Sequence, residues 1–99
     1  MNNTQKYIEK VRTFLKARDN KGSDLHLAKV MNVSRSAIYQ WKTGRSGVDI
    51  REGYKIALLL EKDPLTVVGE LFQDEFKNPE TREFFQVVLD NQNHSDSAA

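Results

Sequence analysis

Four side chains between residues 35 and 40 carry hydrogen-bonding groups at a spacing that suits one face of a short helix: Arg35, Ser36, Tyr39 and Gln40. An arginine guanidinium can donate two hydrogen bonds to guanine O6 and N7, and a glutamine amide matches adenine N6 and N7. Tyr39 could stack on a sugar or contact a thymine methyl group, and Ser36 adds a hydroxyl. These residue types indicate contact with base edges in a DNA groove. The alternatives are a capping or surface charge for Arg35, a solvated face for Gln40 and partial packing for Tyr39.

Basic and hydroxyl side chains on either side of this segment form a second set, which could contact a sugar–phosphate backbone. The set comprises Lys21, Ser23, Ser34, Lys42, Thr43, Arg45 and Ser46. Ser23 is an expected N-cap, and the free N–H groups and dipole at a helix start favour a phosphate. The acidic Asp24 beside it opposes dense phosphate contact there. A single lysine is more often a solvated surface charge, so this expectation depends on the whole group.

Residues for metal binding or catalysis are scarce. The chain has no cysteine, which excludes a disulfide framework and a cysteine-ligated zinc site, and its two histidines, His26 and His94, are far apart in sequence. It contains no glycine-rich phosphate loop, nucleophile elbow or His-Glu-x-x-His arrangement. We therefore expect neither an enzyme nor a cofactor-dependent protein.

Apolar residues recur at three- and four-residue steps along most of the chain, which predicts an all-α fold. The expected helices cover about residues 4–18, 24–31, 35–43, 50–60, 64–76 and 80–89. No strand-like alternation persists, and no internal repeat is visible. The residues after 90 have no apolar anchor, so we expect a disordered tail over 91–99.

The boundaries of these helices follow from residues that start or stop a helix. The expected start signals are the caps Ser23, Ser34 and Asp49 and the pairs Asp63-Pro64 and Asn78-Pro79, which place proline at a first helical position. The polar run Asp19-Asn20-Lys21-Gly22 should end the first helix, with glycine as a natural terminator, and Gly44 should end the third. Asn32 should end the second, because asparagine tolerates the left-handed backbone better than most residues.

Residues 23–44 contain two short helices separated by only about three residues, so the helices must cross at a steep angle. Ala28 is small where they would approach most closely, and Ile38 and Trp41 can fill the space between them. This pattern resembles the helix-turn-helix of the Cro and phage-repressor family, in which alanine is followed four residues later by glycine, then by Val-Ser, by Ile and Trp three apart, and by glycine. Asn32 stands at the position of the first glycine.

The wider chain is similar to short phage-related regulators within that family. It shares Ser-Asp-x-x-Leu-Ala-Lys-x-Met-x-Val-Ser from Ser23, Tyr-x-Trp-x-x-Gly from Tyr39 and Arg-x-Phe-Phe from Arg82. The resemblance implies a lambda-repressor-like DNA-binding domain of five helices over residues 1–78, with the motif at about 23–44, and a sixth helix over 79–90. It also implies double-stranded DNA as the partner.

The charge of the chain is divided unequally between its halves. Residues 1–55 carry twelve basic and five acidic side chains, a net charge of +7, whereas residues 56–99 carry three and nine, a net charge of −6. This asymmetry suggests a half that faces a polyanion, although clustering on solvated helix faces is the alternative. The acidic half is also rich in apolar residues. We expect its last helix, with part of the preceding helix, to form a two-fold dimer interface that includes Phe76, Phe84, Phe85, Val88 and Leu89, unless the last helix folds back on its own core.

These patterns together predict a sequence-specific DNA-binding transcriptional regulator, most simply a phage or mobile-element repressor that binds a pseudo-palindromic operator as a homodimer. One alternative is an antitoxin-type protein that binds DNA and masks a toxin with its acidic half. Another is a replication-control or accessory protein that binds DNA away from promoters. We expect a cytoplasmic location, because no apolar run approaches the ~20 residues of a membrane span and the N-terminus lacks the apolar stretch of a signal peptide.

Overall fold

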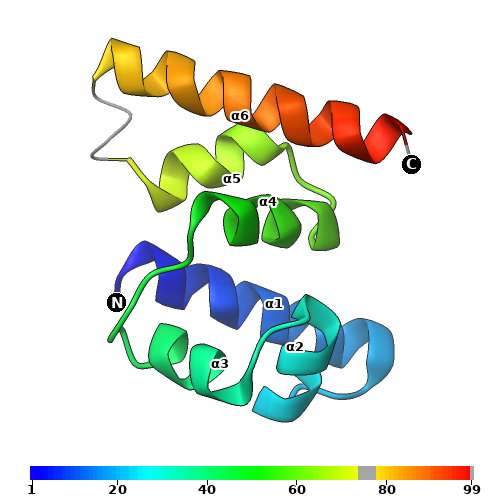
Figure 1. Cartoon of the computed structure of the whole chain (residues 1–99). Helices are drawn as coiled ribbons and strands as arrows, with labels where there is room; N and C mark the ends of the chain where they lie inside the picture. The colour runs from blue at the N-terminus through cyan, green and yellow to red at the C-terminus, as the bar shows by residue number, and fades with distance from the viewer. Residues whose placement is uncertain (74–77, 99) are drawn as a thin grey trace.

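The computed structural model describes residues 1–73 and 78–98, and this part of the chain contains six helices and no strand (Figure 1). The helices are α1 (Asn3–Asp19), α2 (Asp24–Met31), α3 (Arg35–Lys42), α4 (Ile50–Leu59), α5 (Pro64–Leu71) and α6 (Pro79–Ala98). The predicted all-α fold is confirmed. Among the described residues, no helix combines the length and apolar character needed to cross a membrane.

Side-chain caps begin the helices at the expected residues. The Ser23 hydroxyl accepts a hydrogen bond from the His26 backbone N–H at 3.1 Å. Asp49 and Glu52 form a capping box, in which each side chain accepts a hydrogen bond from the other residue's backbone N–H, at 2.7 and 2.8 Å. Each cap satisfies N–H groups that the helix itself cannot pair, so these residue types set where α2 and α4 start.

A residue with left-handed backbone follows each of the first three helices. Two of these residues, Asn32 and Gly44, are the ones that the sequence predicts. Asn32 ends α2 with φ 56°, and Gly44 follows α3 with φ 76°. Helix α1 ends within the predicted polar run, but the residue with left-handed backbone is Asn20, with φ 57°, and not Gly22 two residues later. Gly22 instead provides space, since a Cβ atom there would lie 2.5 Å from Lys16 Cγ.

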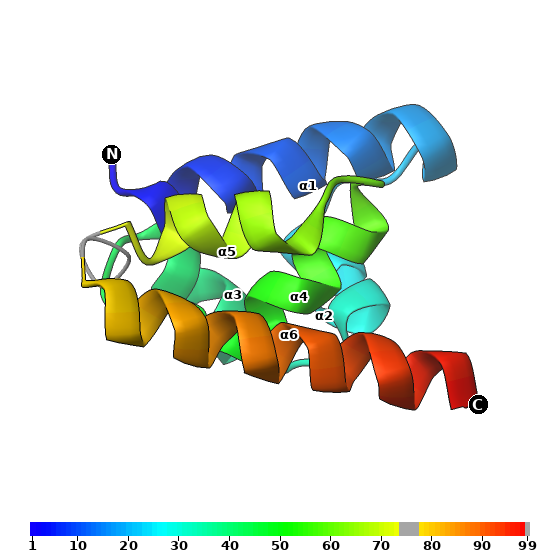
Figure 2. The same ribbon diagram turned by 90° about the horizontal axis from the view of Figure 1, so that it is seen from above.

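The main core is formed by the inner faces of the first four helices, with a contribution from α5. Figure 1 shows α1 running alongside α2 and α3, with α4 and α5 on its other side, and Figure 2 shows the same arrangement from above. Its fully buried side chains include Ile8, Val11 and Leu15 of α1, Leu27 of α2, Ile38 of α3, Ile56 of α4 and Val67 of α5. Because α3 packs against this core, its inner face is fixed while its outer face stays free.

Helix α6 lies across α5 and α4 of its own chain (Figure 1). Leu89 is only 2 % exposed and packs in a second cluster with Tyr54 and Val68. Phe85 lies against Phe72, with ring centroids 5.6 Å apart. At Phe85 and Leu89 the last helix therefore folds back on its own chain, which is the alternative to the predicted dimer interface. Leu89, which the sequence predicts in that interface, is not part of an exposed patch.

The helix also continues further than expected, because α6 reaches Ala98 where a disordered tail over 91–99 was predicted. No proline or glycine follows Pro79 to stop the helix. A hydrogen bond of 2.9 Å from the Gln86 amide to the Asp90 carboxylate links successive turns. The lack of apolar residues in this segment was therefore not sufficient to predict disorder, and Ala99 lies outside the described residues.

Candidate nucleic-acid interface

Helices α2 and α3 are joined by a short turn with defined backbone geometry. The Val33 N–H donates to the Ala28 carbonyl at 3.0 Å, and the Asn32 N–H donates to the Lys29 carbonyl at 3.3 Å. Ser34 then caps α3, accepting a hydrogen bond from the Ala37 N–H at 3.0 Å. Since the turn is held by backbone bonds at one end and a cap at the other, α2 and α3 form a unit with little freedom to change their crossing angle.

The outer face of α3 brings together the four side chains predicted to contact bases. Ile38 and Trp41 point into the core, with 0 % and 3 % of their surfaces exposed. The four exposed residues of the same helix are Arg35, Ser36, Tyr39 and Gln40. Within residues 1–73 and 78–98, the side chains of Arg35 and Ser36 form no hydrogen bond or ion pair. Their donors are therefore available to an external partner.

Tyr39 lies between two cationic side chains instead of against the core. The Lys42 Nζ is 5.8 Å and the Arg45 guanidinium carbon 5.4 Å from its ring centroid, and the side chain is 46 % exposed. These distances are within the range of cation–π attraction. The exposed ring thus forms part of a positively charged surface.

Gln40 is exposed, and its neighbourhood is organised by the loop that follows α3. The Arg45 N–H donates to the Gln40 carbonyl at 2.9 Å, and the Ser46 hydroxyl donates to Gln40 Oε1 at 3.3 Å. The Thr43 hydroxyl donates to the Tyr39 carbonyl at 2.7 Å. The sequence predicts that the hydroxyls of Thr43 and Ser46 contact phosphates, but their protons are used in these bonds. The N–H groups of the Gln40 amide remain available as donors.

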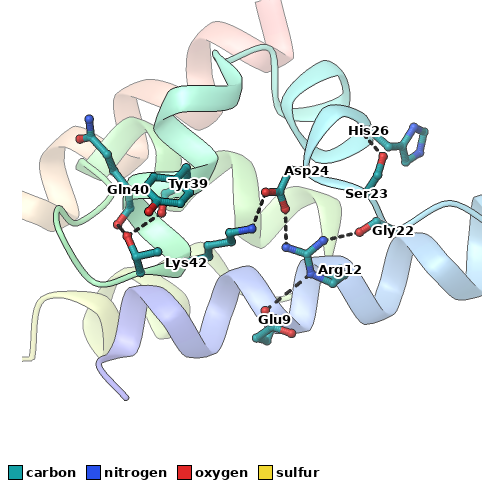
Figure 3. A network of polar contacts seen from close by, with 10 residues as sticks. Glu9, Arg12, Gly22, Ser23, Asp24, His26, Tyr39, Gln40 and Lys42 are labelled. Atoms are coloured by element: carbon teal, nitrogen blue, oxygen red, sulfur yellow. Dashed lines mark hydrogen bonds and ion pairs between the residues drawn. The ribbon is translucent and has the colours of Figure 1, made fainter.

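The sequence predicts that Lys42 offers its ammonium to a phosphate. In the structure this ammonium instead pairs with Asp24. Lys42 Nζ lies 2.6 Å from one oxygen of the Asp24 carboxylate, and Arg12 Nη2 lies 2.8 Å from the other (Figure 3). Arg12 also donates to the Gly22 carbonyl and lies 3.6 Å from Glu9. Hydrogen bonds from Lys42, and next from Arg12, hold the pKa of Asp24 below its usual value.

The partners of Lys42 could not be found by reading local sequence. Asp24 lies 18 residues from Lys42 and 12 residues from Arg12, so no helical spacing connects them. From the sequence alone, the acidity of Asp24 predicts only weaker phosphate contact beside Ser23. The structure makes it the shared partner of two cations from α1 and α3, which joins all three helices.

The remaining residues of the phosphate set surround the α2–turn–α3 unit. Lys21 and Arg45 are exposed, as are Ser23 and Ser34. A capping hydroxyl accepts through its oxygen, so the O–H of both serines can still donate. His26, next to Ser23, lies 2.8 Å from Asp19. No group of three or more potential metal ligands occurs among the described residues.

The apolar residues of α6 divide between its two faces. Leu89 is buried, and Phe85 and Val88 are half-buried, whereas Phe84 is 62 % and Val87 58 % exposed. Val87 was not in the predicted interface, and Phe76 lies outside the described residues. Exposed acidic side chains share the outer face: Glu80, Glu83 and Asp90. The free apolar surface is therefore narrower than predicted and is flanked by negative charge.

Comparison of the chain with family models, curated proteins and solved structures finds no match.

Proposed function

We propose that this protein is a sequence-specific DNA-binding transcriptional regulator with a lambda-repressor-like arrangement of its first five helices. The observation that carries the proposal is the outer face of α3, where Arg35, Ser36, Tyr39 and Gln40 are exposed together on a helix that is anchored by Ile38 and Trp41. Such a helix fits the major groove of B-DNA, and its first residues meet base edges.

In this mechanism α3 is the recognition helix of a helix-turn-helix. Arg35 donates to guanine O6 and N7, and Gln40 pairs with adenine after the 3.3 Å bond from Ser46 to its amide oxygen opens. The hydroxyls of Ser23 and Ser34 and the charge of Arg45 contact phosphates on either side of the groove, which fixes the position of α3. No cofactor takes part.

The charge distribution supports the same orientation. The half of the chain that contains α1, α2 and α3 has a net charge of +7, and the half that contains α6 has a net charge of −6. Attraction at the positive face and repulsion at the acidic face turn the protein toward DNA before contact. The proposal places the protein with the DNA in the cytoplasm.

One such domain covers about half of an operator, so we propose binding as a two-fold dimer with recognition helices roughly 34 Å apart. The exposed Phe84 and Val87 of α6 are the side chains that could bury apolar surface between copies. Dimer formation on DNA would explain how a domain of this size reaches specific affinity. Occlusion of a promoter is the simplest regulatory outcome.

Selection of bound duplexes from a random pool tests the proposal directly. The expected result is enrichment of one pseudo-palindromic sequence whose half-sites are separated by about one helical turn. A symmetric selected site indicates that the protein binds as a dimer. The bases selected within each half-site show which bases α3 contacts. Recovery of no preferred duplex at moderate salt would reject the proposal.

A second candidate function is that of an antitoxin, which would bind DNA through α3 and a toxin through α6. The observation that favours it is the exposed pair Phe84 and Val87 beside the acidic residues Glu80, Glu83 and Asp90. That surface suits a basic partner with an apolar groove. Expression together with the neighbouring reading frame, followed by purification through this chain, separates the two: a stable complex favours the antitoxin, and a homodimer alone favours the repressor.

A further inference from the structure

The Arg12–Asp24–Lys42 network lies on the same side of the molecule as the residues proposed to contact DNA. Figure 3 shows Lys42 reaching from the end of α3 to Asp24 at the start of α2, with Tyr39 and Ser23 nearby. An ammonium at this place would be well positioned for a DNA phosphate. It is instead bound 2.6 Å from a carboxylate of the same chain.

The two cations of the network differ in how firmly they are held. Arg12 has three partners, namely Asp24, Glu9 and the Gly22 carbonyl, and its side chain is 18 % exposed. Within the described residues Lys42 has the Asp24 carboxylate as its ion-pair partner and the Tyr39 ring, 5.8 Å from Nζ, as a weaker contact, and its side chain is 34 % exposed. Removing the charge of Asp24 would therefore release Lys42 and leave Arg12 largely in place.

Helix α3 is also held by contacts that do not involve this ion pair. The Lys42 carbonyl accepts a hydrogen bond from the Gln5 amide at 3.1 Å, and Ile38 and Trp41 remain in the core. The backbone of Lys42 thus stays fixed when its ammonium is free. A change at Asp24 would alter the charge available to DNA while preserving the geometry of the outer face of α3.

We propose that Asp24 limits the sequence-independent component of DNA binding by holding the Lys42 ammonium away from phosphates. The inference rests on the proposed function. Each phosphate contact contributes about 0.9 to the slope of log affinity against log salt concentration for B-DNA. By withholding one cation, Asp24 lowers that slope and leaves more of the binding free energy to contacts made by the outer face of α3.

The test measures salt dependence of binding to a random-sequence duplex for the full chain and for three variants. Asp24→Asn removes the charge with little change in shape. We expect the slope of log affinity against log salt concentration to be steeper by about 0.9 in this variant than in the wild type. If the two bind equally at 1 M salt, the variant should bind about eightfold more tightly at 0.1 M. Lys42→Gln should leave the wild-type slope unchanged. In the double variant Asp24→Asn/Lys42→Gln the slope should return to the wild-type value.

Glu61→Gln is the matched control, because it makes the same change in net charge at an exposed residue between α4 and α5. It should not change the slope. The inference is overturned if Asp24→Asn leaves the slope unchanged, or if the double variant keeps the steeper slope, since the effect would then not depend on Lys42.

The Lys42→Gln variant tests the inference even if Asp24→Asn does not fold. A slope that falls by about 0.9 in Lys42→Gln would show that the wild-type ammonium already contacts a phosphate, which would overturn the inference. Circular dichroism establishes folding of each variant. If the wild-type chain binds no duplex, the proposed function fails. If it binds but the slopes do not separate as stated, the inference alone fails.

Discussion

Helices α3 and α6 both bury one face and expose another, but they expose opposite chemistry. Helix α3 buries Ile38 and Trp41 in the main core and presents arginine, serine, tyrosine and glutamine side chains to solvent. Helix α6 buries Leu89 in a smaller cluster and presents Phe84 and Val87 among carboxylates. The first surface offers hydrogen bonds and positive charge, and the second offers apolar area and negative charge.

Under the proposed function, this difference separates two kinds of contact within one small chain. The exposed face of α3 can discriminate among partners because its donors are directional and its backbone is fixed by the core. The exposed face of α6 provides area without directional bonds, which suits a contact with protein. The same comparison predicts that changes near α3 will affect either the core or recognition, whereas changes in α6 will affect stability or association.

The largest effect is expected for Trp41→Ala, which tests whether α3 is anchored as described. Trp41 is 3 % exposed, and its removal leaves a cavity in the main core. We expect a loss of about 3–5 kcal/mol in the free energy of unfolding, measured by urea denaturation. A loss below about 1 kcal/mol would mean that α3 is not held by this side chain, and the contrast with α6 would disappear.

The next effect is expected for Leu89→Ala, because Leu89 belongs to a smaller cluster than Trp41. We expect a loss of roughly 2–3 kcal/mol in the free energy of unfolding. Phe84→Ala, on the exposed side of the same helix, is the matched control and should change that quantity by less than about 0.5 kcal/mol in the monomer.

Protein concentration distinguishes packing within the chain from packing between copies. If Leu89 packs on its own chain, the loss in Leu89→Ala will be the same at low and high protein concentration. If Leu89 instead lies between two copies, the loss will grow as the protein is concentrated, because association then contributes to stability. The second result would restore the predicted dimer interface at this residue.

Much of the fold could be predicted because the signals are local. The N-caps Ser23, Ser34 and Asp49 satisfy N–H groups within three residues, and the apolar spacing of α1 determines which of its faces is buried. The outer face of α3 follows from the same reasoning, since fixing Ile38 and Trp41 inward leaves the other side exposed.

The features that sequence reasoning missed depend on distant residues or on competition between neighbours. Arg12, Asp24 and Lys42 meet only because three helices pack together, and no local pattern encodes that meeting. Asn20 and Gly22 can each adopt the left-handed backbone that ends a helix, and the local sequence alone does not show that Asn20 is the residue that does so. Helix α6 is longer than the sequence predicts, because a segment without apolar anchors can still continue a helix that has already formed.

A smaller effect, on binding alone, is expected for substitutions on the outer face of α3. Arg35→Ala should cost about 1–3 kcal/mol of binding free energy at one base position of the selected site and relax the preference there. Its free energy of unfolding should change by less than about 0.5 kcal/mol, since the side chain is exposed and has no partner among the described residues. Footprints on operators mutated one position at a time provide the measurement. Equal weakening on every sequence would assign Arg35 to phosphate contact instead of base reading.

The smallest effect is expected from acid, and it follows from the lowered pKa of Asp24. A carboxyl with a lower pKa in the folded chain binds fewer protons there than in the unfolded chain at the same pH. Its contribution to stability is therefore complete above the ordinary aspartate pKa of about 3.9 and is lost as the pH falls below it. Solvent screens this partly exposed group, so the loss is modest.

Urea midpoints measured from pH 6 to pH 3 for the wild type and Asp24→Asn provide the comparison. The difference between the two should be largest at pH 6 and should shrink as the pH approaches 3, because the Asp24 carboxyl of the unfolded wild-type chain then binds protons that the folded chain, with its lower pKa, takes up less readily, while the amide does not titrate. Glu52 acts in the opposite direction, since burial raises its pKa and a raised pKa favours the folded chain at low pH. Glu52→Gln keeps a side-chain acceptor for the Asp49 N–H but removes the titrating carboxyl. The free energy of unfolding should therefore fall more steeply with acid in this variant than in the wild type. A constant difference between wild type and Asp24→Asn across this range would mean that Asp24 stabilises α2 by capping or shape, and that its ion pairs with Arg12 and Lys42 contribute nothing to folding.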